Sequence, residues 1–275
     1  MPLRQPRRAG LLLVTSQTTS YNSEADDGFY QAGLQKRYEI LTVGQHAGTS
    51  AIDLVHLTAI TIAFAATTPG TITDTGADLA MFKTGETIVI TGSGLNDGVY
   101  TVSTGNVAGT IRTTEATVLE AAGATVSIAK REAHSNECVQ DLVTGLMWSR
   151  YTSAQYATMG IDGDGTMPWT GQLYDIFQYA AAANAASLGG YTDWRITNDM
   201  ELLALRNMEV ANAAPDPAGG AFPAWPRSSI QFIWTSTTNP ADIAKAMSMY
   251  FFNGGLTGNP AKTVAYYVAL ARGGV

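Results

Sequence analysis

Short runs of alternating apolar and polar residues dominate the stretch from residue 46 to 130, and β-branched side chains are frequent in it. The tight-turn sequence Asn96-Asp97-Gly98 within it is typical of a β-hairpin. Short strands at this spacing predict a small barrel or sandwich that serves as a spacer or docking module. The period of two predicts half-buried strands at 57–65, 86–91, 99–103, 109–113 and 124–128.

A helical period follows after residue 170. Apolar residues, Leu173 and Phe177 among them, recur at the spacing of one helix face within residues 171–186. Asn198, with Glu201 three residues later, forms a capping box and predicts the start of a second helix. Helices followed by short strands in one compact unit predict an α+β domain. These later strands are predicted at 231–236, 246–252 and 264–271.

Charged residues make up only 14% of the 275-residue chain, against a usual share of about 25%. The net charge of −7 excludes nucleic acid as a partner, because an acidic surface repels phosphate and gains no counterion release. The polar surface must come from Thr, Ser, Asn, Gln and Tyr instead. Such a surface is typical of β-rich extracellular or virion proteins that pack against neighbours.

Three features bear on cofactors and compartment. Cys138 is the only cysteine, so neither an intrachain disulfide nor a thiolate metal site can form. No apolar run approaches the ~20 residues of a membrane span, so we expect no membrane insertion. Residues 1–10 carry three arginines and form a basic arm, because the apolar stretch after them is too short for a signal peptide. We therefore expect synthesis in a host cytoplasm without a signal peptide.

The best metal candidate is the loop Asp162-Gly-Asp164-Gly165. Two carboxylates on a glycine-rich loop suit calcium, which prefers oxygen ligands in flexible geometry. A third ligand and a distal Glu are missing at the expected places, and a solvated turn is the alternative. The pair Asp26-Asp27 is a weaker candidate of the same kind. Apart from this possible calcium ion, the sequence predicts no cofactor.

Aromatic and amide side chains on loops are the usual contacts for sugars. A glycine- and asparagine-rich segment at 253–260 lies between two predicted strands, where recognition residues are common. For Trp225 a place in the core is the alternative. The candidate ligand-binding residues are Trp169, Tyr174, Trp225, Asn253 and Asn259.

Five segments spread along the chain form an ordered set of motifs. They are Thr15-Ser-Gln-Thr-Thr-Ser-Tyr21 with Asp26-Asp27-Gly28, Asp141-Leu-Val-Thr-Gly-Leu-Met-Trp148, Gly190-Tyr-Thr-Asp-Trp-Arg-Ile-Thr-Asn-Asp-Met-Glu-Leu202, Trp234-Thr-Ser-Thr237 and Ala269-Leu-Ala-Arg-Gly-Gly274. In this order they resemble the C-terminal domain family of the Lcl collagen-like adhesin, and each segment is weak alone but specific in combination.

The resemblance implies a C-type-lectin-like α+β domain formed by residues 11–45 and 131–275. Residues 46–130 interrupt it, and they are similar to small β-modules of bacteriophage structural proteins, which implies an inserted all-β barrel or sandwich. We expect the motif residues to build the fold through packing, ion pairing and capping. These structural residues are Asp141, Trp148, Asp193, Trp194, Arg195, Glu201, Trp234 and Arg272.

Together these features favour a non-enzymatic virion protein, such as a phage tail fibre, head fibre or receptor-binding component. It would display the lectin-like domain to a glycan or protein on the host surface. Formylglycine-generating enzymes share the lectin-like fold but use two active-site cysteines, and this chain has one. The adhesin domain binds sulfated polysaccharides, and the net charge of −7 disfavours that ligand class here.

We expect a homo-oligomer, with a trimer favoured, and contacts with other virion structural proteins. Two alternatives stay open. One is a capsid decoration or tail structural protein with no ligand of its own. The other is a bacterial surface adhesin.

Overall fold

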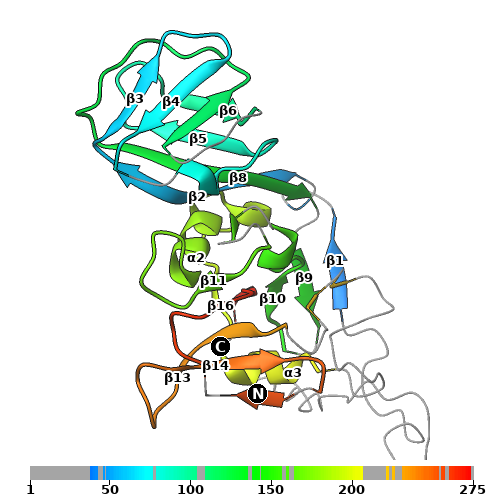
Figure 1. Ribbon diagram of the computed structural model, residues 1–275. Coiled ribbons are helices and arrows are strands. Elements are labelled where there is room, and N and C mark those ends of the chain that lie inside the picture. The colour runs from blue at the N-terminus through cyan, green and yellow to red at the C-terminus, as the bar shows by residue number, and fades with distance from the viewer. Residues whose placement is uncertain are drawn as a thin grey trace, which may run out of the picture.

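The computed structural model describes most of the chain from residue 38 onward. Among the described residues the fold is mostly β, with two α-helices. Figure 1 shows an upper group of strands, whose lowest members form a long pair, and helices and shorter strands below that pair. The described ranges are 38–42, 46, 48–76, 79–103, 109–135, 138–142, 144–156, 159–160, 164–206, 221–222, 225–226, 231–253, 255–257 and 260–273.

The upper group consists of two facing sheets. One sheet has the order β2 (Thr49–Ala59), β8 (Val126–Ser135), β5 (Thr87–Thr91) and β6 (Gly98–Thr101). The other consists of β3 (Ile62–Ala65), β4 (Gly70–Asp74) and β7 (Thr110–Thr113), and the short 3-10 helix η2 (Leu79–Met81) lies beside β7. Side chains from both sheets share one core, whose largest members are Phe64, Phe82 and Tyr100. The predicted hairpin is present as β5 and β6, paired from Thr87–Thr101 to Ile90–Gly98.

The single strand predicted at 57–65 is wrong, because the chain turns a corner at Ile60 and Thr61. β2 ends at Ala59 and β3 starts at Ile62, and the two strands belong to different sheets. The hydroxyl of Thr61 donates to Oδ1 of Asp74 at 2.6 Å, which anchors the corner. The alternation changes phase at this corner, since Leu57 is buried before it and Ile62 and Phe64 are buried after it.

The lower group contains the remaining sheets. The largest has the order β1 (Tyr38–Leu41), β9 (Cys138–Asp141), β10 (Met147–Ser149), β17 (Leu270–Arg272) and β12 (Arg195–Ile196). The smaller sheets are β13 (Ile233–Thr238) with β14 (Ala246–Tyr250) and β15 (Gly255–Thr257), and β11 (Met167–Pro168) with β16 (Ala265–Tyr266). The predicted strand at 264–271 is therefore two strands, in different sheets.

Strands β1 and β9 lie on either side of residues 46–130 along the chain and pair directly in space. Their antiparallel register runs from Tyr38–Asp141 to Leu41–Cys138. The chain thus leaves the lower group at one strand and returns at its neighbour, and the insertion stays a prediction. The exact domain boundaries stay a prediction.

The two helices begin at local capping residues. Helix α2 (Ile176–Ala185) starts where the carboxylate of Asp175 accepts bonds from the backbone N–H groups of residues 177 and 178, later than the predicted start at 171. Helix α3 (Asp199–Ala204) has Asn198 as its N-cap, and Glu201 completes the predicted capping box. Two 3-10 turns, η3 (Ser153–Gln155) and η5 (Leu188–Gly190), connect the lower strands.

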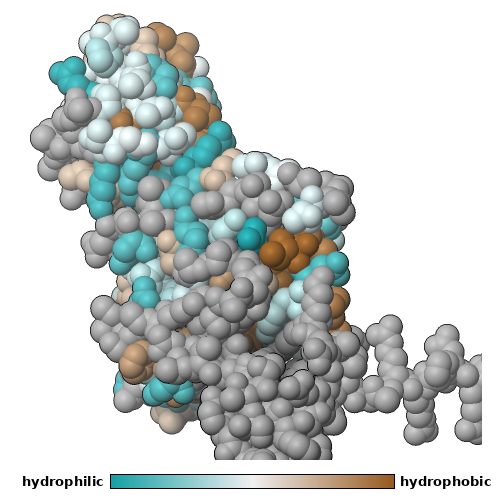
Figure 2. All heavy atoms as spheres, turned by 90° about the vertical axis from the view of Figure 1, so that its right-hand side faces the viewer, coloured by the Kyte–Doolittle hydropathy of each residue, from teal (hydrophilic) through white to brown (hydrophobic). Residues whose placement is uncertain are grey.

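Strand β2 joins the two groups because its side chains enter both cores. Ile52 and Leu54 pack in a lower core with Tyr156 and Trp194, whereas Leu57 packs in the upper one. Between them His56 is buried and stacks on Tyr174, with ring centroids 4.7 Å apart and ring planes 8° apart. The upper group's surface is mostly pale in Figure 2, which fits its threonine-rich and weakly charged sequence.

Candidate functional site

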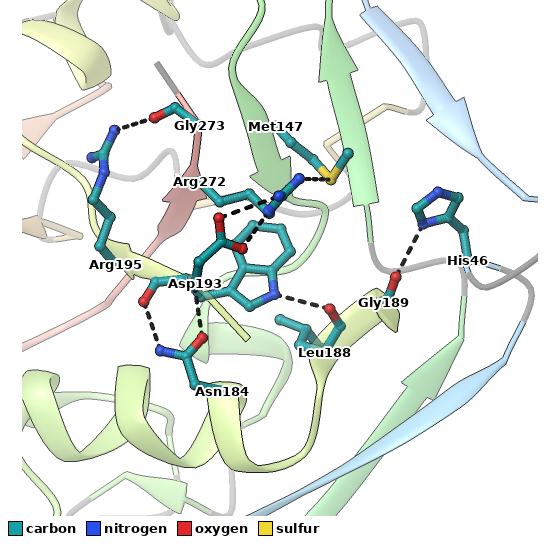
Figure 3. A network of polar contacts seen from close by, with 10 residues as sticks. His46, Met147, Asn184, Leu188, Gly189, Asp193, Arg195, Arg272 and Gly273 are labelled. Atoms are coloured by element: carbon teal, nitrogen blue, oxygen red, sulfur yellow. Dashed lines mark hydrogen bonds and ion pairs between the residues drawn. The ribbon is translucent and has the colours of Figure 1, made fainter. Parts of the chain in front are cut away.

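Hydrogen bonds with Asn184 and Leu188 hold the segment Asp193-Trp-Arg195 beside α2 (Figure 3). The Asn184 amide donates to the Trp194 carbonyl at 2.8 Å and accepts from the Trp194 N–H at 2.6 Å. The indole Nε1–H donates to the carbonyl of Leu188 at 2.9 Å. The side chain is 3% exposed, so it packs as part of the lower core.

Asp193 and Arg195, which flank Trp194, each form an arginine–carboxylate ion pair. Arg272 donates to Asp193 through Nε at 2.6 Å and through NH2 at 3.2 Å, and this pairing lowers the pKa of the Asp193 carboxyl. Arg195 donates to both oxygens of Glu201, at 2.8 and 2.6 Å, and NH2 also reaches the Gly273 carbonyl at 3.1 Å. The Glu201 hydrogen bond raises the pKa of Arg195.

The other motif residues also make internal contacts. The buried Asp141 accepts from the Thr144 N–H at 3.3 Å through Oδ1, in the turn before β10. Trp148 and Trp234 are fully buried, and Nε1–H of Trp234 donates to the Met167 carbonyl at 3.2 Å. These motif residues therefore bond and pack within the domain, and together they form its structural framework.

A groove with a volume of about 440 Å³ lies beside this framework, between α2 and strands β12 and β13. Phe177, Ala180 and Ala181 form its helix side. Arg195 and Ser236 line its strand side. Phe177 is 42% exposed, which corrects the predicted placement of this residue on the buried stripe of the helix. The helix buries Ile176 and Ala180, as the spacing predicts, together with Tyr179 and Ala183.

Trp169, a predicted ligand residue, lies next to this groove. Its ring packs edge-to-face against Phe177, with centroids 4.8 Å apart, and its Nε1–H donates to the Thr235 carbonyl at 2.8 Å. Lys262 lies over the same indole, with Nζ 3.9 Å from the ring centroid. No sequence pattern predicted that Phe177 or Ser236 would lie near Trp169, because helix, strand and loop meet here only in the folded chain.

The other predicted ligand residues lie elsewhere. Tyr174 stacks on His56 at the junction with β2. Trp225 is 1% exposed and donates from Nε1 to the Arg150 carbonyl at 3.0 Å, so no ring face is open to a ligand. Asn253 is exposed and accepts from the Gly255 N–H at 3.0 Å within the β14–β15 turn. Asn259 lies outside the described residues.

The predicted calcium loop is described only in part. Asp164 accepts from the N–H and the hydroxyl of Thr166 through the same oxygen, both at 2.8 Å, which is the contact pattern of a turn. Asp162 and the pair Asp26-Asp27 lie outside the described residues. Within the described part of the chain, no three His, Cys, Asp or Glu residues cluster in a way that could hold a metal.

The fold and this framework define a β-rich domain. Its motif residues form two arginine–carboxylate pairs, Arg272 with Asp193 and Arg195 with Glu201. Within it, residues 137–272 match the family model of the Lcl C-terminal domain, so this part of the chain is an Lcl C-terminal domain. The first resembling segment, at 15–28, lies outside the matched range. Searches of curated proteins and of solved structures found no significant match.

The helices in the described ranges are short. None is long and apolar enough to cross a membrane.

Proposed function

We propose that this chain is a non-enzymatic adhesion protein of a virus particle, such as a tail fibre, head fibre or receptor-binding component. Its Lcl C-terminal domain would recognise a glycan or protein on a host surface. The observation that carries the proposal is the open groove on this adhesin-type domain. The charged residues of the motifs are engaged in internal pairs beside it, which supports a binding role rather than a catalytic one.

A second candidate is a capsid or tail structural protein with no ligand of its own, and the upper strand group supports it. Leu95, Val118 and Leu119 are 63%, 52% and 69% exposed on two neighbouring loops. Asn96 fixes these loops, because its amide exchanges hydrogen bonds of 2.8 and 3.0 Å with the backbone of Val118. Glu120 accepts from the backbone N–H groups of residues 94 and 95. Rigid exposed aliphatic groups suit packing against other subunits.

Two measurements separate these functions. Antibodies against the protein would be tested on purified particles by electron microscopy. Labelled full-length protein would be tested for retention on intact cells of the strain that carries the encoding genome. Labelling of particles together with retention on cells supports the adhesion role. Labelling of particles without cell retention supports the structural role, and retention on cells without particle labelling supports a bacterial surface adhesin.

A further inference from the structure

We propose that the groove between α2 and strands β12–β13 binds a neutral hexose unit of a glycan. This inference rests on the proposed adhesion function and names the ligand class and the contact residues. The groove's volume of about 440 Å³ lies within the ~300–1,000 Å³ of pockets that bind small ligands. Nothing in the framework of motif residues fills it.

The helix side of the groove is shaped for a flat ring. Phe177 keeps 42% of its side chain exposed, and the perpendicular Trp169 ring fixes its orientation. Ala180 and Ala181 lie one turn further along the same helix, and their small side chains let a ligand approach the helix closely. An apolar wall with one aromatic ring matches the apolar face of a pyranose.

The opposite side of the groove offers a hydrogen-bonding group that is not used internally. The Ser236 hydroxyl has no hydrogen-bond partner among the residues the structure describes. Arg195 also lines the groove, but its guanidinium bonds to Glu201 and to the Gly273 carbonyl and extends away from α2 (Figure 3). The Ser236 hydroxyl can donate to or accept from a hydroxyl group of a sugar.

Charge selects a neutral sugar over an anionic one. Glu201 lies 2.6 Å from the Arg195 guanidinium, so the pair brings no net charge to the groove. The chain as a whole carries −7, which repels sulfated or carboxylated polymers. A groove with mostly apolar walls and neutralised polar groups therefore favours uncharged hydroxyl groups over phosphate, sulfate or carboxylate.

The test measures binding of the full-length chain to polyacrylamide conjugates of galactose, glucose, mannose and N-acetylglucosamine, with a sulfated conjugate alongside. Phe177→Ala removes the aromatic wall, and Ala181→Gln fills the groove without deleting a contact. Both keep good helix formers in α2. We expect either change to weaken binding to a neutral conjugate by at least about tenfold. Phe252→Ala is the matched control, because Phe252 is 43% exposed on another surface.

The inference is overturned by no binding to any neutral conjugate, by binding only to the sulfated one, or by unchanged binding of both groove variants. Loss of binding in the control variant alone would instead place the site near the loop at 253–260.

The proposed adhesion function fails separately. If the unaltered protein is not retained on cells, that function is wrong. If Phe177→Ala and Ala181→Gln leave cell retention unchanged, only the groove inference fails. Retention that survives periodate but not protease treatment of the cells identifies a protein receptor and overturns the sugar assignment.

Discussion

Arg272, on the last described strand, donates two hydrogen bonds to Asp193, which lies 79 residues earlier in the chain. The same guanidinium lies 3.6 Å from the ring centroid of Tyr191. Arg195 joins the same two segments from the other side through the Gly273 carbonyl. The Asp-Trp-Arg motif and the closing strand of the Lcl C-terminal domain are therefore tied together by the contacts of these two arginines (Figure 3), and Trp194 itself packs in the lower core.

Arg195→Lys should destabilise the domain while keeping the positive charge. A lysine ammonium cannot make the two parallel bonds to Glu201, and it loses the contact with the Gly273 carbonyl as well. The Arg195 side chain is 41% exposed, so we expect a modest loss of about 1 kcal/mol in the free energy of unfolding. Urea unfolding followed by tryptophan fluorescence measures it.

The control for that change is Lys245→Ala. Lys245 and Asp242 form a solvent-exposed pair, so the loss should stay below about 0.5 kcal/mol. Equal losses in both variants would show that the two-point contact of Arg195 has no special weight.

Gly189→Ala should be strongly destabilising. Gly189 has a φ of +57°, and an added Cβ would overlap the sulfur of Cys138. Backbone strain and overpacking together should lower the free energy of unfolding by about 3 kcal/mol, which urea unfolding measures. Gly145→Ala is the matched control, since Gly145 has a φ of +74° but open space around its Cα. Its loss of stability comes from the backbone strain of an alanine at positive φ alone, and we expect it to be about 1 kcal/mol.

The double variant Gly189→Ala with Cys138→Ala tests the clash directly. Removing the sulfur should recover part of the stability lost by Gly189→Ala, because the new methyl group takes the vacated space. Strictly additive losses would mean that the two positions do not interact and that the backbone conformation alone excludes alanine.

Local contacts were predictable from the sequence, and contacts between distant segments were not. The Asn198–Glu201 capping box was identified correctly, because the interacting residues lie three positions apart. The tight turn predicted at residues 96–98 is wrong, because β5 ends at Thr91, β6 starts at Gly98, and a six-residue loop connects them. The helix stripe was misassigned at Phe177, since periodicity identifies a helix but not which face other segments will cover. The groove needs α2, β12 and β13 together, and only the tertiary fold brings them to one place.

His56 shows the same limit, because its setting depends on segments more than a hundred residues apart. Burial lowers the pKa of His56 to about 4, against 6.5 for an exposed histidine. Nδ1 lies 2.7 Å from the Leu54 carbonyl and Nε2 lies 2.9 Å from the Met159 carbonyl. A neutral ring donates to only one of them. The nearby ammonium of Lys130, which pairs with Glu86 at 3.2 Å, further disfavours protonation.

Stability should therefore fall on acidification between about pH 6.5 and pH 4. In this window the unfolded chain binds a proton at His56 and the folded chain does not. The free energy of unfolding therefore decreases as the pH falls. Above pH 7 this contribution is constant, and the full loss below the folded pKa amounts to about 3 kcal/mol. Urea unfolding at a series of pH values measures the slope.

His56→Asn is the comparison for the pH series. It should be less stable than the unaltered chain at pH 7, since it loses the stack on Tyr174. Its stability should nevertheless change less between pH 6.5 and 4, because the carboxylates that titrate there are common to both proteins. Parallel pH curves for the two proteins would contradict the assignment to His56.

Replacing the exposed leucines of the upper loops tests whether the upper strand group packs against other subunits. Leu95→Ser with Leu119→Ser removes two side chains that are 63% and 69% exposed, while Asn96 and Glu120 still hold the loops together. Surface changes of this kind should alter unfolding by less than about 0.5 kcal/mol. If these leucines pack against a neighbour, the double variant should be incorporated poorly into particles. Its oligomer should also be weaker and should dissociate at a higher protein concentration than the unaltered oligomer, which light scattering measures. Incorporation and oligomer size equal to those of the unaltered chain would leave the loops without a role in assembly.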